Sequence, residues 1–79
     1  MKVKFFAQLK TVTGCQETDI PAPGSVCVDA LWQHLEALWP GIQRHRKTTR
    51  LAKNCQFAPK DALFAEGDEV ALIPPVSGG

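Results

Sequence analysis

The sequence lacks three features that would each point to a familiar class of protein. It has no apolar run near the roughly 20 residues of a membrane-spanning helix, so we expect no membrane association. Its Lys and Arg (9) nearly balance its Asp and Glu (8), which leaves a net charge of +1 and no overall bias toward nucleic acid. Its 3 cysteines form no CxxC pair, so we expect reduced thiols and no metal site.

The chain is also short, which limits what it can do alone. Its 79 residues suffice for a single domain at 1–79. Such a domain has little volume for the roughly 300 Å³ or more of a small-molecule pocket, so we expect no enzyme activity in the isolated chain. Residues 1–6 contain neither the apolar segment nor the cleavage site of a signal peptide, and we therefore expect the protein in the cytoplasm.

Hydrophobic patterning and turn residues divide the chain into short elements. Strands are expected at residues 3–6, 17–20, 50–54, 56–57 and 69–73, and short helical segments at 7–13 and 42–47. Residues 61–64 are expected to form a turn, with Leu63 or Phe64 filling the core. The last strand is nearly all apolar, which predicts a central position buried on both faces.

One long helix is predicted at residues 25–39. Its apolar side chains recur at steps of three and four, which places on one face Val28, Leu31, Leu35 and Leu38. Ser25 or Cys27 is expected at its N-cap, and Pro40 ends it. An amphipathic helix must cover something apolar, and the only candidate is the sheet.

This order of elements predicts an α+β fold of ββαββ type. The first and last strands are the most apolar, so we place them side by side at the centre of a mixed sheet. They run parallel because the helix between them supplies the crossover. One helix on one face of such a sheet is the β-grasp, or ubiquitin-like, arrangement.

The last six residues, 74–79, are interpreted as an extended functional tail. Pro74 and Pro75 favour an extended course, and six residues reach roughly 20 Å. Gly78 and Gly79 have no side chains, so the end can enter a narrow channel in a partner. The carboxylate of Gly79 is an unhindered acyl group. Once adenylated and attacked by a persulfide, it can become a thiocarboxylate, whose sulfur is nucleophilic.

Apolar residues also gather near the start of this tail. Phe6, Pro74, Pro75 and Val76 would form a docking patch if exposed, although Phe6 is equally consistent with the core. Residues 44–53 form a basic stretch, interpreted as a solvated loop and helix end. A second interpretation is a nucleic-acid patch, but the stretch lacks the interleaved aromatic side chains that would stack on bases. The third interpretation is docking to an acidic surface of a partner.

The C-terminal residues resemble a known family. The segment Gly-Asp-Glu-Val-Ala-Leu-Ile-Pro-Pro-Val-Ser-Gly-Gly, residues 67–79, is similar to the C-terminal signature of the small, sulfur-carrier subunits of molybdopterin synthase. Residues 3–9 resemble that family's first strand and following helix, and residues 51–54 resemble its middle strand. Lys10 stands where relatives often have Arg, and Lys53 occupies a strand position that is usually apolar.

The resemblance implies a non-catalytic sulfur donor within a sulfurtransferase complex. An E1-like adenylating enzyme would use ATP to place a transient AMP on Gly79, and a donor such as a persulfide protein would supply the sulfur. No cofactor would be bound permanently. Two carriers would dock on a dimer of the large catalytic subunit, giving a heterotetramer. The threaded tail would comprise Ser77, Gly78 and Gly79, and Lys10 would join the docking residues. The sulfur would build the dithiolene of molybdopterin from precursor Z.

Three other functions remain open. A sulfur carrier for a different pathway, such as thiamine synthesis, has the same fold, although that branch usually lacks the Pro-Pro pair. A ubiquitin-like modifier would be conjugated to target lysines through Gly79. The third alternative is a small binding module in which the tail has no role.

Overall fold

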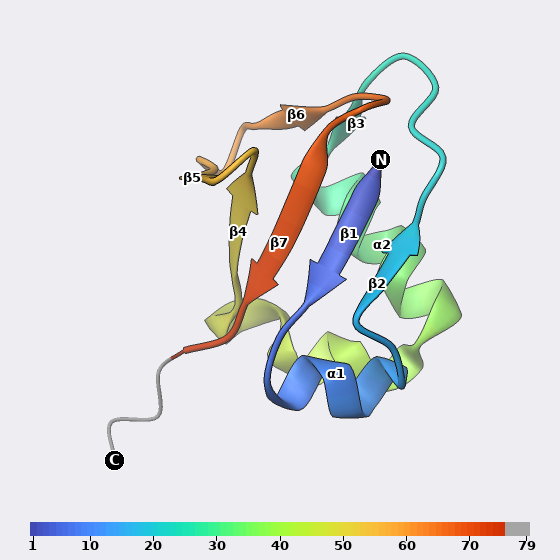
Figure 1. Cartoon of the computed structure of the whole chain (residues 1–79), viewed down its shortest axis with the longest axis vertical. Helices are drawn as coiled ribbons and strands as arrows, with labels where there is room; N and C mark the ends of the chain where they lie inside the picture. Colours follow the sequence, from blue (N-terminus) through green and yellow to red (C-terminus); the bar gives the residue numbers. More distant parts are fainter. Residues whose placement is uncertain (76–79) are drawn as a thin grey trace.

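The computed structural model describes residues 1–75 and is built around one mixed sheet (Figure 1). The strands are β1 (Lys2–Phe5), β2 (Glu17–Asp19), β3 (Val26–Cys27), β4 (Arg50–Lys53), β5 (Gln56–Phe57), β6 (Leu63–Phe64) and β7 (Glu69–Ile73). The helices are α1 (Gln8–Thr13), α2 (Val28–Leu38) and the 3₁₀ helix η1 (Pro40–Thr48). Five strands form the main sheet in the order β2-β1-β7-β4-β5, and β3 pairs with β6 separately.

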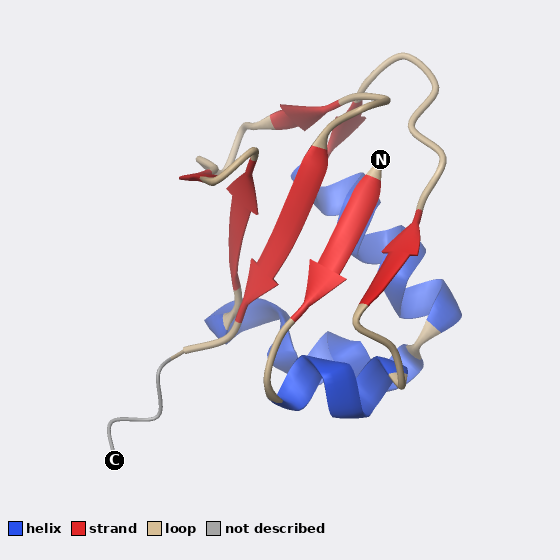
Figure 2. Ribbon diagram, viewed as in Figure 1, coloured by secondary structure: helices blue, strands red, loops and turns tan. Residues whose placement is uncertain are grey.

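The first and last strands of the main sheet form its centre. β1 and β7 run parallel, with Val3 opposite Val70 and Phe5 opposite Leu72. These four side chains are at most 1% exposed. They pack beneath α2, which crosses one face of the sheet, behind it in Figure 2. The predicted parallel central pair and the β-grasp arrangement are therefore confirmed.

One cluster of apolar side chains joins the sheet to the helices. Phe5 packs edge-on against Trp39, with ring centroids 5.4 Å apart. Among the residues that the structure describes, none that is polar or charged is buried. The buried members of the cluster are Met1, Val3, Phe5, Leu9, Ile20, Ala22, Leu31, Trp32, Leu35, Ile42, Leu51, Phe64, Val70 and Leu72. Folding therefore depends on apolar packing rather than on a buried polar network.

The prediction that β7 is buried on both faces is wrong. Val70 and Leu72 are fully buried, whereas Ala71 and Ile73 are only half-buried. The helices pack on one face, and within residues 1–75 no helix covers the other (Figure 2). Ala71 and Ile73 are apolar without being part of the core, and on the opposite face of the sheet they lie beside the charged residues Lys4 and Arg50.

The long helix is shorter than predicted, and its buried face is rotated. α2 covers residues 28–38 rather than 25–39. Trp32 is 2% exposed, whereas Leu38, predicted on the buried face, is 51% exposed. The row of residues that face the core continues from Leu35 to Trp39, which lies four residues later in the sequence, because Trp39 packs on Phe5. Of the helices within residues 1–75, none is long and apolar enough to cross a bilayer.

The segment before α2 is a strand, which the sequence patterns did not predict. Val26 and Cys27 pair with Phe64 and Leu63 of β6, so Ser25 is not the N-cap and residues 63–64 are not a turn. Cys27 caps the helix instead: its sulfur accepts a hydrogen bond from the Ala30 N–H at 3.4 Å. Phe64 fills the core as predicted, but Leu63 is 53% exposed.

A polar network ties two turns together at the edge opposite the C-terminal end of β7. The Asp68 carboxylate accepts the Ala65 N–H at 2.8 Å and the Asn54 side-chain amide at 3.1 Å. Lys53, unusual at a strand position, donates through Nζ to the Leu63 carbonyl at 2.7 Å. The Ala65 N–H, the Asn54 amide and the nearby Lys53 ammonium together lower the pKa of Asp68. The network thus favours the ionised form of Asp68 in the folded protein.

A matched pair of leucines tests the corrected face of α2. Leu35→Ala removes a fully buried side chain, and we expect it to lower the free energy of unfolding by about 2–5 kcal/mol. Leu38→Ala, on the same helix but half-exposed, should change it by about 0.5 kcal/mol or less. Urea denaturation followed by circular dichroism measures both. Equal losses would contradict the described orientation of the helix.

The Asp68 network predicts a pH dependence of stability. Because its pKa is lowered by folding, Asp68 stabilises the protein above its unfolded pKa of about 3.9, and this contribution is lost as the pH falls through the folded pKa. Asp68→Asn should therefore lower Tm at pH 7, and its difference from the unsubstituted protein should shrink toward pH 3. Asp61→Asn is the control, since the Asp61 side chain forms no hydrogen bond or ion pair with the described residues. A pH-independent difference for Asp68→Asn would contradict the prediction.

Candidate functional site

The candidate site lies at the edge of the sheet where β1 and β7 both end. Parallel strands end at the same edge, and Phe5 is the partner of Leu72 in the last register position. Pro74 and Pro75 therefore leave the sheet next to the point at which Phe6 follows β1 (Figure 1). Pro74 is half-buried and Pro75 is exposed. The structure thus brings together three of the predicted docking residues.

Phe6 lies outside the core. β1 was predicted to include it but ends at Phe5, because Ala7 has a φ of +51° and turns the chain into α1. The Leu9 N–H donates to the Phe6 carbonyl at 3.0 Å, which starts the helix. The Phe6 side chain is 45% exposed, so the interpretation of Phe6 as a core residue is wrong. An exposed aromatic ring beside the start of the tail is suited to contact a partner.

Lys10 lies beside Phe6. Both residues line a hollow of about 180 Å³ that Lys4, Gln16 and Glu17 also border. Lys10 is exposed and forms no ion pair with the described residues. An uncompensated cation next to an exposed aromatic side chain can contact a carboxylate on a partner. Its docking role stays a prediction.

The other cations on this part of the sheet are paired. Lys4 Nζ lies 2.9 Å from Glu69 Oε1, and Lys2 Nζ lies 3.6 Å from Glu17 Oε2. The hydrogen bond between Lys4 and Glu69 raises the pKa of Lys4 and lowers that of Glu69. Both groups are therefore charged at neutral pH, and they offset each other. Lys10 differs from Lys2 and Lys4 because no carboxylate within residues 1–75 forms an ion pair with it.

The four residues at the end of the predicted tail lie outside the described residues. They are Val76, Ser77, Gly78 and Gly79. The docking role of Val76, the threading of Ser77 and Gly78, and the sulfur chemistry of Gly79 stay predictions.

The structure adds residues that the sequence patterns did not single out. Ile73 and Ala71 lie on the uncovered face, where they pair with Arg50 and Ala52 of β4. Phe57, the partner of Ala52 in β5, is 60% exposed. The signal that could have identified this face is the alternation of buried and half-buried positions within β7. The sequence hides this alternation because the half-buried Ala71 and Ile73 are as apolar as the buried residues beside them.

The described residues offer little chemistry of their own at this edge. Within residues 1–75, no three His, Cys, Asp or Glu side chains are placed to hold a metal ion. Cys15 is half-buried and Cys27 and Cys55 are exposed, all as free thiols. What the edge supplies is a surface next to the start of the tail.

Comparison with known proteins identifies the family. The family model described as the ThiS family matches residues 3–79. The chain belongs to the ThiS family. The resemblance seen at the C-terminus therefore extends over nearly the whole sequence.

Relatives within this family have a consistent name. The chain is 37% identical to the molybdopterin synthase sulfur carrier subunit of Escherichia coli over 82 aligned residues, which cover 100% of this chain and 99% of that protein. It is 32% identical to the protein of the same name from Homo sapiens, with 100% and 93% covered.

Two solved structures of similar fold have different names. The structure of SAMP1 from Haloferax volcanii matches with a TM-score of 0.84 and 29% identity, and 99% of this chain and 97% of that chain are covered. A complex of subunits 1 and 2 of the molybdopterin-converting factor from Helicobacter pylori matches with a TM-score of 0.70 and 23% identity, covering 99% and 96%. The latter supports the fold alone.

Two adjacent phenylalanines test the geometry of this edge. Phe5→Ala empties a core position that is 1% exposed and should cost about 3–5 kcal/mol of unfolding free energy. Phe6→Ala removes a half-exposed ring and should cost about 1 kcal/mol or less. Chemical denaturation of both variants measures the difference. A large loss for Phe6→Ala would show that Phe6 belongs to the core after all.

Proposed function

We propose that this protein is the sulfur carrier of a molybdopterin synthase and acts through the carboxylate of Gly79. The observation that supports this most is the match to relatives of that name, of which the Escherichia coli protein is 37% identical and 99% covered. The fold supports it as well, because β7 ends at Ile73 and directs Pro74 and Pro75 away from the sheet. The carrier itself is not the catalyst.

The chemistry follows from the poor reactivity of a carboxylate. Attack of the Gly79 carboxylate on ATP, in an E1-like enzyme, gives an acyl-adenylate and releases pyrophosphate. The terminal sulfur of a persulfide then displaces AMP and forms an acyl disulfide. A thiol cleaves its S–S bond and leaves the thiocarboxylate on Gly79. Each step needs groups from a partner, and the carrier contributes the acyl group and its docking surface.

The partner that receives the sulfur is proposed to be the large catalytic subunit. The name shared by the relatives describes one subunit of a synthase, and the Helicobacter pylori structure contains subunits 1 and 2 of a related factor together. In the proposed heterotetramer each of two carriers extends Ser77, Gly78 and Gly79 into an active site. Phe6 and Lys10 contact the large subunit beside the tail, together with Pro74, Pro75 and Val76. The sulfur passes to precursor Z, and two charged carriers complete one dithiolene.

A second candidate function is that of a protein modifier. The similarity to SAMP1, a small archaeal modifier protein in the solved structures, favours it. Conjugation would begin from the same adenylate on Gly79, with a lysine amine rather than a persulfide as the nucleophile. The two functions differ in the product at Gly79 and not in the fold.

Mass spectrometry of the intact protein separates the two. When the chain is purified with its natural C-terminus from cells that contain its charging enzyme, we expect a species with one oxygen replaced by sulfur. Addition of the large subunit and precursor Z should consume that species and yield molybdopterin. A variant without Gly79 should do neither, although its folded domain is unchanged. A ladder of lysine conjugates without the sulfur species would contradict the carrier function and favour the modifier.

The docking surface has its own test. Phe6→Asp should weaken binding of the large subunit while the protein stays folded, because the ring is exposed. Gln8→Asp, nearby on α1 and also exposed, is the control with the same charge change. Isothermal titration calorimetry measures both affinities. Equal affinities would exclude Phe6 from the interface.

A further inference from the structure

A second surface has the features of a binding groove. It measures about 700 Å³ and lies between the start of α2, the end of η1, the start of β4 and the segment at 58–60. Its apolar lining consists of Val28, Trp32, Leu51, Ala58 and Pro59. Of these segments, the start of β4 lies next to the end of β7, because Arg50 is the partner of Ile73.

The groove exists because the sheet is incomplete on that side. β5 pairs only with the end of β4, and the last link is the hydrogen bond from the Ala58 N–H to the Leu51 carbonyl at 2.8 Å. Pro59 follows and has no N–H to donate, so the ladder stops there. Within residues 1–75 no strand pairs with Arg50 on this side. The groove therefore borders the apolar layer between the sheet and α2, where Val28 and Ala58 are partly exposed while Trp32 and Leu51 are buried.

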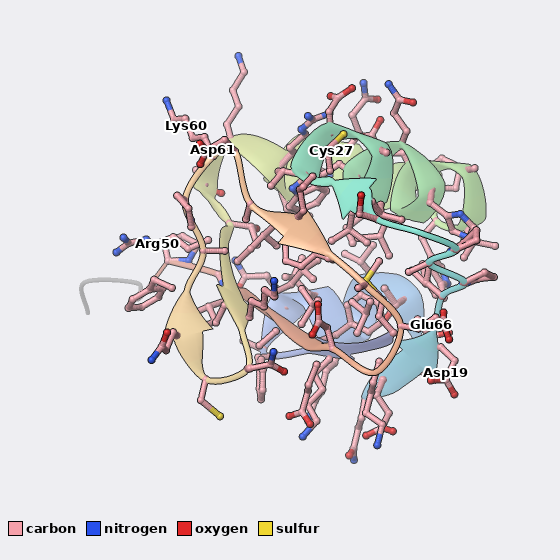
Figure 3. All side chains as sticks on the ribbon, turned by 90° about the horizontal axis from the view of Figure 1, so that it is seen from above. Asp19, Cys27, Arg50, Lys60, Asp61 and Glu66 are labelled. Atoms are coloured by element: carbon pink, nitrogen blue, oxygen red, sulfur yellow. The ribbon has the colours of Figure 1, made fainter. Side chains whose placement is uncertain are left out.

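The rim of the groove is basic. Lys47, Arg50 and Lys60 border it, and none forms an ion pair with a carboxylate of the described residues. Figure 3 shows Arg50 and Lys60 projecting outward on the same side of the molecule. The Arg50 guanidinium lies 4.3 Å from the centroid of the Phe57 ring, which restricts its position. Three uncompensated cations around an apolar floor favour a ligand that is acidic at its edges and apolar at its centre.

The remaining charges of the groove are already balanced. Asp29, the only acidic residue of the lining, forms an ion pair with Arg46. Glu36 lies 3.6 Å from the same guanidinium. Asp61 follows Lys60 in sequence but does not line the groove. The net field at the rim is therefore positive.

We propose that this groove binds an acidic, extended segment of a partner protein, with one apolar side chain on its floor and carboxylates against Lys47, Arg50 and Lys60. The proposal is independent of the chemistry at the tail and holds whether or not Gly79 carries sulfur. It assigns a role to Lys47 and Arg50 of the basic stretch at 44–53. Arg50 is the partner of Ile73, so a protein that holds the tail can also reach this groove.

Two other occupants fit less well. Single-stranded nucleic acid binds by stacking bases on exposed aromatic rings, but Trp32 is only 2% exposed and Phe57 has the Arg50 guanidinium over its ring. A second copy of the chain would need a free acidic segment. The most acidic segment of the chain, residues 66–69, already makes contacts within its own fold. Glu66 accepts a hydrogen bond from the Ala22 N–H at 2.8 Å, and Glu69 forms an ion pair with Lys4.

The test uses the whole chain labelled with ¹⁵N and a defined probe. The probe is a capped peptide with a single leucine flanked on both sides by aspartate and glutamate. Amide shifts on titration should be concentrated at the groove, at residues 28–32, 46–51 and 58–60. Lys47→Glu and Lys60→Glu should each weaken binding about threefold to tenfold, as an exposed attraction is replaced by a repulsion. Binding should also weaken as salt is raised.

Arg44→Glu is the matched control. Arg44 lies on η1, three residues before Lys47, is exposed, and does not line the groove. Its substitution changes the net charge by the same amount and should leave the affinity nearly unchanged. An equal loss for Arg44→Glu and Lys47→Glu would overturn the proposal, because it would indicate attraction to the basic stretch as a whole.

Two further probes test the chemistry of the ligand. Replacing the leucine of the peptide by serine should weaken binding, since the floor is apolar. Equal affinity of the two peptides would overturn the proposed apolar contact. A decathymidine oligonucleotide should bind more weakly than the leucine peptide, and tighter binding of the oligonucleotide at the same residues would replace the proposal with a nucleic-acid site. Amide dispersion of each variant confirms that the surface substitutions leave the fold intact.

Discussion

The parallel pairing of β1 with β7 is the contact on which the rest of this structure depends. It joins the two ends of the described chain, and it brings Val3, Phe5, Val70 and Leu72 together beneath α2. A small domain has one core, so losing this pair would remove its centre rather than one of several layers. The same pairing determines the geometry of the candidate site, because Phe6 and Pro74 follow strands that end at the same edge of the sheet.

Much of this could be predicted from sequence because the signals were local or strongly patterned. The apolar residues 70–73 and the single amphipathic helix were sufficient to indicate a central parallel pair and its crossover. Periodicity did not fix where β1 ends, since that depends on the positive φ of Ala7, a conformation that alanine seldom adopts. Leu38 was wrongly predicted on the buried face for a similar reason. From Leu35, a step of three leads to Leu38 and a step of four leads to Trp39, and both steps fit a helix. Only the packing of Trp39 on Phe5 decides between them.

Other features were beyond reach of the sequence because they arise between distant segments. β3 and β6 are two-residue strands that exist only through pairing across the fold, so neither has a pattern of its own. The basic groove combines residues near positions 30, 47, 50 and 60 of the sequence. Its apolar floor depends on the end of the β4–β5 hydrogen-bond ladder at Pro59, which the sequence pattern did not indicate. The tail chemistry was the opposite case. Its signal is the contiguous motif at 67–79, whose last four residues lie outside the described structure.

The two prolines after β7 have a consequence for how the carrier communicates with its partners. Neither Pro74 nor Pro75 can donate a main-chain hydrogen bond, so the ladder of the sheet cannot be extended past Ile73 through these residues. A chemical change at Gly79 thus lies four residues beyond the last proline and has no ladder through which to alter the core. Under the proposed function, the loaded and the empty carrier differ in covalent structure only at this terminal group, so a partner can distinguish them by direct contact with Gly79. The folded domain then supplies a docking surface that both states have in common.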